Sequence, residues 1–346
     1  MLDWGLGHTT RSTPIISYLL QFQCQIFIAA TSDQRKMLEN DFSTLEYIQI
    51  EGYNVRYGDT GQDFIFTILR QLPRLYSAVR REGAWLDQQM AIHQFDLVIS
   101  DNRYGLYHRH CASVFITHQL SVISGWGTIA DRFLRMIHYS FIRRFNACWI
   151  PDMEGPSNLS GKLSHPPAIP GGATYIGPLS RMETLSPTDH LDLLVILSGP
   201  EPQRTILESI LINQLENYSG NYLLVRGLPS APPLSNPFIV NYLSATALNQ
   251  AICNAVLVIA RSGYSSIMDL VKLKKKAILI PTPGQTEQEY LAGYIEDQGL
   301  FMKAAQKDFR LDKAILKATT FPFKGSQTDF DLYRSVLSRF MQSLPH

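Results

Sequence analysis

Short runs rich in Val, Ile and Leu alternate along the chain with stretches in which apolar residues recur at helical spacing. These runs are too short for helices and predict buried strands. They lie at 25–29, 46–50, 95–100, 113–117, 147–150, 193–197, 222–225, 238–240, 256–260 and 277–280. Because helical spacing fills most of the intervals between them, the pattern predicts an α/β protein with parallel sheets.

Residues 151–190 interrupt this alternation and are rich in Pro, Gly and Ser, which predicts a connection between domains that contains one short strand at 175–176. The chain of 346 residues also exceeds the ~250–300 residues at which single cores stop growing. We therefore predict two Rossmann-like, doubly wound domains with a cleft between them, formed by residues 1–178 and 179–328. The amphipathic segment 329–346 is predicted to return as a helix to the first domain.

Composition excludes several classes of protein. A net charge of +1 gives no sign of nucleic-acid binding, and 18% charged residues argue against disorder. The four cysteines are far apart and form no CxxC pair, which is typical of buried thiols in a reducing cytosol. No apolar run approaches the ~18–20 residues that span a bilayer. We expect a cytoplasmic protein.

A strand, a glycine turn and a helix follow one another at 256–272, and they predict an anion site. The first N–H groups of a helix are unpaired and carry partial positive charge, which suits phosphate. Ser265 and Ser266 lie near the start of this helix, one turn before Asp269. A pyrophosphate is expected on the serines and N–H groups, with Asp269 accepting hydrogen bonds from ribose hydroxyls. An ordinary capped helix start is the alternative.

The first half of the chain has polar groups where ligands bind in open α/β sheets. Gly5 and Gly7 form a tight loop that ends in His8, directly before a helical pattern. Asp101 and His118 each follow an apolar strand. A doubly wound domain begins with a strand, and only two residues precede Asp3 in this sequence. We expect that the first strand is missing.

Taken together, these motifs resemble the GT-B glycosyltransferases of the MurG type, family 28. The matching features occur in the same order and cover most of the chain. They are the loop Gly5-Leu6-Gly7-His8, the pair Ser198-Gly199, the stretch from Arg261 to Asp269 and the stretch from Pro281 to Glu289. His118-Gln119 is similar to a His-Glu pair of that family. The resemblance implies two Rossmann-like domains, with the donor bound by the second.

The resemblance also implies roles for individual residues. The pyrophosphate of a nucleotide sugar, UDP-linked in this family, is expected to contact the helix start and the loop facing it. These residues are Ser198, Gly199, Ser262, Gly263, Ser265 and Ser266. Arg181 matches an arginine near the phosphates, Asp269 a ribose ligand, and the backbone at Leu243 a support for the base. Gln288 and Glu289 match a pair that binds sugar hydroxyls.

His8 is the expected general base, because a neutral imidazole near pH 7 can take a proton from an acceptor hydroxyl. Asp101 and Asp3 are alternative bases. The resemblance implies inverting transfer of a hexosyl or N-acetylhexosaminyl group. We expect the reaction to need no metal, since no DxD motif lies among these residues. The acceptor is expected to be a hydroxyl compound, in this family a lipid-linked one. Gly5, Gly7, Asp101 and His118 are candidates for its side of the site.

Two other functions share these features. Nucleotide-sugar hydrolases of the same fold also carry a Gly-x-Gly-His loop, and water replaces the acceptor in them. A binding protein without catalytic activity would keep the nucleotide site alone.

The segment 129–145 has an apolar face and a basic face when drawn as a helix. Apolar side chains fall on one face: Ile129, Phe133, Ile137 and Phe141. Basic side chains fall on the other: Arg132, Arg135, His138 and Arg143. Such a helix can rest on an anionic membrane surface. The alternative is a surface helix whose apolar stripe packs on the sheet.

Overall fold

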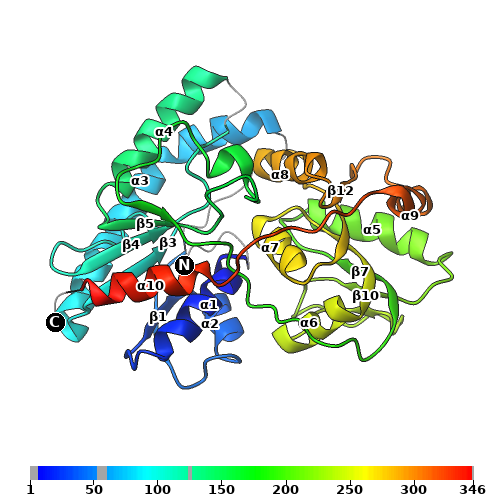
Figure 1. Ribbon diagram of the computed structural model, residues 1–346, viewed down its shortest axis with the longest axis horizontal. Coiled ribbons are helices and arrows are strands. Elements are labelled where there is room, and N and C mark those ends of the chain that lie inside the picture. Colours follow the sequence, from blue (N-terminus) through cyan, green and yellow to red (C-terminus); the bar gives the residue numbers. More distant parts are fainter. Residues whose placement is uncertain (1–6, 53–60, 124–126, 345–346) are drawn as a thin grey trace. The chain divides into compact units, whose positions relative to one another are not determined.

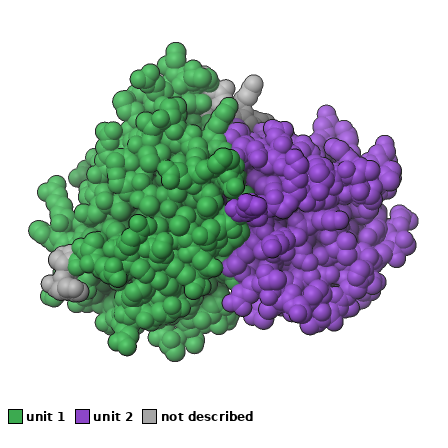
Figure 2. All heavy atoms as spheres, in the orientation of Figure 1, with its two compact units in different colours: residues 1–181, 328–346 green, residues 182–327 purple. Residues whose placement is uncertain are grey.

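The computed structural model describes residues 7–52, 61–123 and 127–344, with side chains from residue 76 onward in the second range (Figure 1). The chain divides into two compact units, shown in Figure 2. Unit 1 comprises Met1–Arg181 and Thr328–His346, and unit 2 comprises Met182–Gln327.

Unit 1 contains a four-stranded parallel sheet in the order β3-β4-β5-β6 and a parallel pair, β1 and β2. The strands are β1 (Phe27–Ala30), β2 (Glu46–Gln49), β3 (Leu97–Asp101), β4 (Ala112–Ile116), β5 (Ala147–Ile150) and β6 (Ala173–Tyr175). The helices are α1 (Gly7–Leu20), α2 (Ser32–Leu38), α3 (Gly61–His93), α4 (Thr128–Ile142), the 3-10 turn η1 (Gly161–Leu163) and α10 (Leu332–Gln342).

The C-terminal helix α10 packs on the sheet of unit 1. Leu337 is fully buried, in one apolar cluster with Ile116 of β4 and Trp149 of β5. The Tyr18 hydroxyl of α1 lies 2.8 Å from the Ser338 hydroxyl of α10. The prediction that the end of the chain returns to the first domain is therefore confirmed.

Unit 2 contains a six-stranded parallel sheet in the order β12-β11-β10-β7-β8-β9. The strands are β7 (Leu191–Ile196), β8 (Tyr222–Val225), β9 (Ile239–Val240), β10 (Ala255–Ala260), β11 (Lys276–Leu279) and β12 (Met302–Lys303). The helices are α5 (Gln203–Leu215), α6 (Ala245–Asn254), α7 (Tyr264–Lys272), α8 (Thr286–Asp297) and α9 (Leu311–Thr320).

The strand order of unit 2 reverses between β7 and β10, because the chain leaves β7 toward β8 on one side and later adds β10 on the other. Open α/β sheets bind their ligands beyond the carboxyl ends of the strands at such a switch point. The loops that follow these two strands contain Ser198-Gly199 and Ser262-Gly263. The expected α/β class with two Rossmann-like units is thus confirmed.

Candidate functional site

Four polar side chains of unit 1 form one hydrogen-bonded network. The Asp101 carboxylate accepts hydrogen bonds from His8 Nδ1 and from Arg11 Nε, each at 2.8 Å. A second nitrogen of Arg11 also pairs with Asp101. The remaining nitrogen, Nη1 of Arg11, lies 3.0 Å from His118 Nδ1. The structure therefore brings together His8, Asp101 and His118, which the sequence placed on three separate segments.

The positions of these residues follow from the elements that carry them. His8 and Arg11 are three residues apart in the first turns of α1 and so share a face. Asp101 ends β3, and His118 follows β4, its parallel neighbour. Asn102, with a φ of 55°, turns the chain away directly after the carboxylate. Neighbouring parallel strands end at one edge of the sheet, so both side chains meet the start of α1 there.

Burial determines the electrostatics of this network. Burial alone would raise the pKa of Asp101, but Arg11 and His8 outweigh it and hold that pKa far below its usual range. Burial, followed by the charge of Arg11, lowers the pKa of His8, and the Asp101 carboxylate opposes this change. At neutral pH the site thus combines an ionised Asp101 with a neutral His8.

The protons can be assigned from these charges. An ionised carboxylate only accepts hydrogen bonds, so the Nδ1–H of His8 donates to Asp101. The other ring nitrogen, Nε2, then carries a lone pair and can accept a proton. A guanidinium only donates, which makes His118 Nδ1 an acceptor. The arrangement is that of a base held in one tautomer by a carboxylate.

Arg11 was not singled out in the sequence, although its buried guanidinium fixes the Asp101 carboxylate through two nitrogens. The available signal was its spacing of three residues from His8. Arg103 belongs to a different contact, because its Nε donates to Glu82 Oε1 at 2.5 Å.

In unit 2, the predicted anion site lies at the start of α7. Gly263 is the N-cap and, as a glycine, has no side chain that could cap the helix. Ser265, Ser266 and Asp269 are half-buried on α7. The Ser262 hydroxyl donates to the Gln288 carbonyl at 2.8 Å, which ties the turn before α7 to helix α8.

A fully buried arginine lies directly before this turn. Arg261 donates to the carbonyls of Ile280 and Pro281 at 3.2 Å and to that of Gln203 at 2.8 Å. Burial lowers its pKa to about 10, so the guanidinium stays charged at neutral pH. It joins the loops after β10 and β11 to the start of α5. In the sequence, Arg261 was named only as the first residue of the stretch that resembles the family, without a role of its own.

Gln288 and Glu289 both contact the loop that precedes α8. Gln288 Oε1 accepts from the Thr282 N–H at 2.9 Å, and Glu289 Oε1 accepts from the Gly284 N–H at 3.0 Å. Both side chains therefore shape this loop. Their expected contacts with a sugar stay a prediction.

The loop after β7 comes close to the same segment of unit 2. Gly199 has a φ of 101°, a conformation that favours glycine. A Cβ there would lie 3.4 Å from the Thr282 hydroxyl oxygen, and this buried hydroxyl has no hydrogen-bond partner among the described atoms. Leu243 is half-buried in the segment between β9 and α6.

Arg181, expected near the donor phosphates, is the last residue of this part of unit 1. Its guanidinium lies 3.2 Å from the Asp41 carboxylate, and its Nε has no partner among the described atoms. Gly7 begins α1, whereas Asp3 and Gly5 lie outside the described residues. The phosphate role of Arg181 stays a prediction.

The described residues contain no group of three His, Cys, Asp or Glu side chains that could hold a metal ion. Among these residues, no helix is both long and apolar enough to cross a membrane.

Comparison with known proteins identifies a family domain in the second half of the chain. Residues 235–329 match the glycosyltransferase family 28 C-terminal domain. The chain is 24% identical over 322 residues to an uncharacterized glycosyltransferase of Methanosarcina acetivorans, covering 85% of this chain and 82% of that protein. A UDP-N-acetylglucosamine–N-acetylmuramyl-(pentapeptide) pyrophosphoryl-undecaprenol N-acetylglucosamine transferase of Sulfurihydrogenibium is 27% identical over 128 residues, 36% of each chain.

Solved structures give the same fold. MurG of Acinetobacter baumannii superposes with a TM-score of 0.52 at 14% identity, covering 97% of this chain and 92% of that one. The glycosyltransferase SnogD of Streptomyces nogalater gives a TM-score of 0.60 at 14% identity, covering 99% and 94%. The family model falls within unit 2 apart from its last two residues, and the archaeal relative and both folds extend over the two units. The chain therefore has the GT-B fold and is a glycosyltransferase whose second unit carries the family 28 C-terminal domain.

Proposed function

We propose that the chain is a metal-independent, inverting glycosyltransferase that moves a hexosyl or N-acetylhexosaminyl group from a UDP-linked sugar to the hydroxyl of a lipid-linked acceptor. The observation that carries this proposal is the His8–Asp101 contact of 2.8 Å. It orients the imidazole so that Nε2 is left as a base. Inverting transfer needs such a base beside the acceptor hydroxyl.

In the proposed reaction, the acceptor hydroxyl gives its proton to His8 Nε2 while its oxygen forms a bond to the sugar C1. The bond between C1 and the phosphate oxygen breaks on the opposite face, and the nucleoside diphosphate leaves with that electron pair. Asp101 stabilises the imidazolium that results, and Arg11 keeps Asp101 ionised and in place.

The leaving diphosphate needs positive potential, which unit 2 can supply from its own groups. The N–H groups at the start of α7 form an anion site, because Gly263 offers no capping side chain. Ser265 and Ser266 would donate to the phosphates, and Asp269 would accept from the ribose. The charge of buried Arg261, directly before the turn, adds to this potential. The proposal of metal independence rests on these groups.

Helix α4 supports the proposal that the acceptor is lipid-linked. Three apolar side chains near its start are exposed: Ile129 by 86%, Phe133 by 57% and Met136 by 61%. They are spaced four and three residues apart and form one stripe, with the exposed Arg132 beside it. We infer that this stripe rests on the inner face of a membrane, where a lipid-linked hydroxyl would be reached.

One expectation about this helix was wrong. His138 was expected on the solvated basic face, but it is buried, and its Nδ1 lies 2.7 Å from the Tyr104 hydroxyl. Burial lowers the pKa of His138 to about 4, so it adds no positive charge at neutral pH. The C-terminal part of α4 therefore packs on unit 1, and only its beginning offers an apolar surface.

A product assay tests the proposal. The chain is incubated with UDP-N-acetylglucosamine or UDP-glucose and a short polyprenyl-pyrophosphoryl sugar, and release of UDP is followed with and without the acceptor. We expect release that depends on the acceptor and a β-linked product by NMR. Equal release without acceptor would identify a hydrolase instead, and binding without turnover would identify a binding protein.

A further inference from the structure

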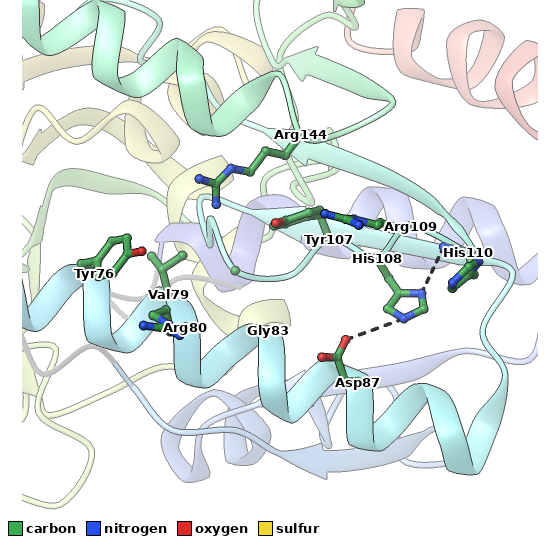
Figure 3. Close-up of a pocket in the computed structure, with 11 residues that line it drawn as sticks. Tyr76, Val79, Arg80, Gly83, Asp87, Tyr107, His108, Arg109, His110 and Arg144 are labelled. Carbon is green, nitrogen blue, oxygen red and sulfur yellow. Dashed lines mark hydrogen bonds and ion pairs between the residues drawn. The ribbon is translucent and has the colours of Figure 1, made fainter.

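Unit 1 also has a groove of about 340 Å³ away from the His8 network, between α3 and the loop that joins β3 to β4. Figure 3 shows side chains from both elements around it. Three of the lining residues are arginines, Arg80, Arg109 and Arg144, and one is an aspartate, Asp87. His108 and His110 lie on the loop side.

The shape of the groove comes from two glycines. A Cβ on Gly105 would overlap the Val79 carbonyl, so glycine allows the loop to lie directly on α3 and close the floor. Gly83 lies on the face of α3 that carries Arg80 and Asp87. A Cβ on Gly83 would meet only the Gly105 carbonyl, at 3.8 Å. The missing side chain at this position keeps the groove open.

Glu82 fixes the loop that forms the far wall. Its Oε1 accepts from Arg103 Nε at 2.5 Å, and its Oε2 accepts from the Gly105 N–H at 2.9 Å. This ion pair is buried, with the two side chains only 1% and 5% exposed. The wall is therefore a built feature of unit 1.

The positive charge of the groove is not neutralised by the protein residues described. None of its three arginines forms an ion pair with a described carboxylate. Arg144 instead lies over the Tyr107 ring at 5.6 Å, and Arg80 lies 6.0 Å from the Tyr76 ring centroid. Asp87, the only carboxylate among the described lining residues, lies 3.7 Å from His108 Nε2. Guanidinium N–H groups remain available to a ligand.

We propose that this groove binds a small phosphate-bearing ligand. Planar guanidinium groups match phosphate oxygens in charge and geometry, and the volume admits more than one phosphate group or a phosphate with an organic part. Two sources share this chemistry, a soluble phosphorylated compound and the headgroup of an anionic lipid. The inference does not depend on the proposed transferase reaction, because no groove residue belongs to the His8 network.

Calorimetric titration with inorganic pyrophosphate tests this site. Gly83→Leu should fill the groove without changing charge, and Leu favours a helix more than Gly does, so the variant should fold. We expect Gly83→Leu and Arg144→Gln each to weaken binding about tenfold or more. Asp87→Asn should strengthen binding, because it removes the one carboxylate that the described part of the lining contains.

Two control variants separate this site from other effects. Arg143→Gln removes an exposed charge next to Arg144 that does not line the groove, and Ser265→Ala alters the donor site of unit 2. Both should retain groove binding. If Arg143→Gln loses pyrophosphate binding as much as Arg144→Gln does, binding depends only on the overall positive charge of the surface. That result would overturn the proposal.

Vesicles distinguish the two sources of the phosphate. If pyrophosphate does not bind, the groove should still increase sedimentation with phosphatidic acid vesicles over phosphatidylcholine vesicles, and Gly83→Leu should abolish that increase. If Gly83→Leu binds pyrophosphate as the wild type does, and also sediments with phosphatidic acid vesicles to the same extent, the inference is wrong. Circular dichroism and the thermal midpoint check that each variant is folded.

Discussion

At the scale of single residues, Asp101 determines which nitrogen of His8 is free. An asparagine there can donate its amide N–H to Nδ1 and so place the proton on Nε2, the wrong nitrogen for a base. We predict that Asp101→Asn lowers kcat by about 10²- to 10⁴-fold, as expected when an orienting carboxylate is lost, with little change in the donor KM. Initial rates of UDP release measure this.

The matched control is Asp96→Asn, which changes an exposed aspartate just before β3, at the other end of this strand. It should keep full activity. Because Asp101→Asn leaves the buried Arg11 without its carboxylate, the thermal midpoint is measured alongside. A folded Asp101→Asn chain with the wild-type kcat would show that His8 does not act through this contact.

The pH profile follows from the pKa of His8, which burial and then Arg11 lower from 6.5. His8 acts as a base only when neutral, so kcat/KM should fall as the pH drops through its pKa in the folded protein. We predict an acidic limb with a midpoint below 6.5. An acidic limb at or above 6.5 would contradict this assignment.

The same shift has a consequence for stability. The unfolded chain binds a proton at His8 more readily than the folded chain does, so protonation favours unfolding. This contribution is absent above pH 6.5 and destabilises the fold as the pH falls from there toward the lowered pKa of His8.

The sequence indicated His8, Asp101 and His118 because each follows a glycine loop or a strand, where side chains reach a ligand edge. It could not indicate that they touch, since 93 residues separate His8 from Asp101 and 107 separate Arg11 from His118. The roles of Arg11 and Arg261 were missed for a related reason. Their partners are a distant carboxylate and three distant carbonyls, which leave no local pattern.

At the scale of elements, helix α10 completes unit 1, and Leu337 is its most buried side chain, with 0% exposure. Truncation there removes apolar contacts with strands β4 and β5 and leaves a cavity. We predict that Leu337→Ala lowers the free energy of unfolding of unit 1 by about 2–5 kcal/mol. Urea unfolding followed by tryptophan fluorescence, to which Trp149 of the same cluster contributes, measures this.

Ser335→Ala is the control for this change, because Ser335 is exposed on the same helix. It should alter stability by no more than about 0.5 kcal/mol. Equal stability of Leu337→Ala and Ser335→Ala would mean that α10 does not hold unit 1 together.

Helix α4 provides a second prediction at this scale. Phe133 is 57% exposed within the apolar stripe, and burial of such a ring at a membrane surface stabilises binding. Phe133→Ser should reduce sedimentation with anionic vesicles about tenfold or more, an effect of about 1.4 kcal/mol or more. Leu316→Ser, which changes a 71% exposed residue of α9, should not. Equal sedimentation of both variants would remove the support for membrane contact.

At the scale of the whole molecule, the alternation of apolar runs predicted nearly every strand and the two Rossmann-like units. Strand β12 was missed, because it has two residues and gives no apolar run. It forms only because Met302 lies beside Ile278 of β11 and the Ala304 N–H reaches the Leu279 carbonyl at 3.0 Å. Strand order was likewise not available from the sequence, since it depends on packing between segments far apart in the chain.

Donor binding should act on the two units differently, because the proposed diphosphate contacts all lie in unit 2 except for Arg181. A ligand that binds only the folded form stabilises it by RT ln(1 + [L]/Kd), about 2.7 kcal/mol at a hundredfold excess over Kd. We predict that UDP raises the thermal midpoint of unit 2 by the same amount with EDTA as with Mg²⁺. The N–H groups at the start of α7, Ser265 and Ser266 would then balance the diphosphate charge without a cation.

Replacing both serines by alanine should remove most of the shift, while Ser209→Ala, an exposed change on α5, should leave it intact. A shift that disappears with EDTA would mean that a metal ion carries part of the charge, and the proposed role of the α7 start would have to be shared with it.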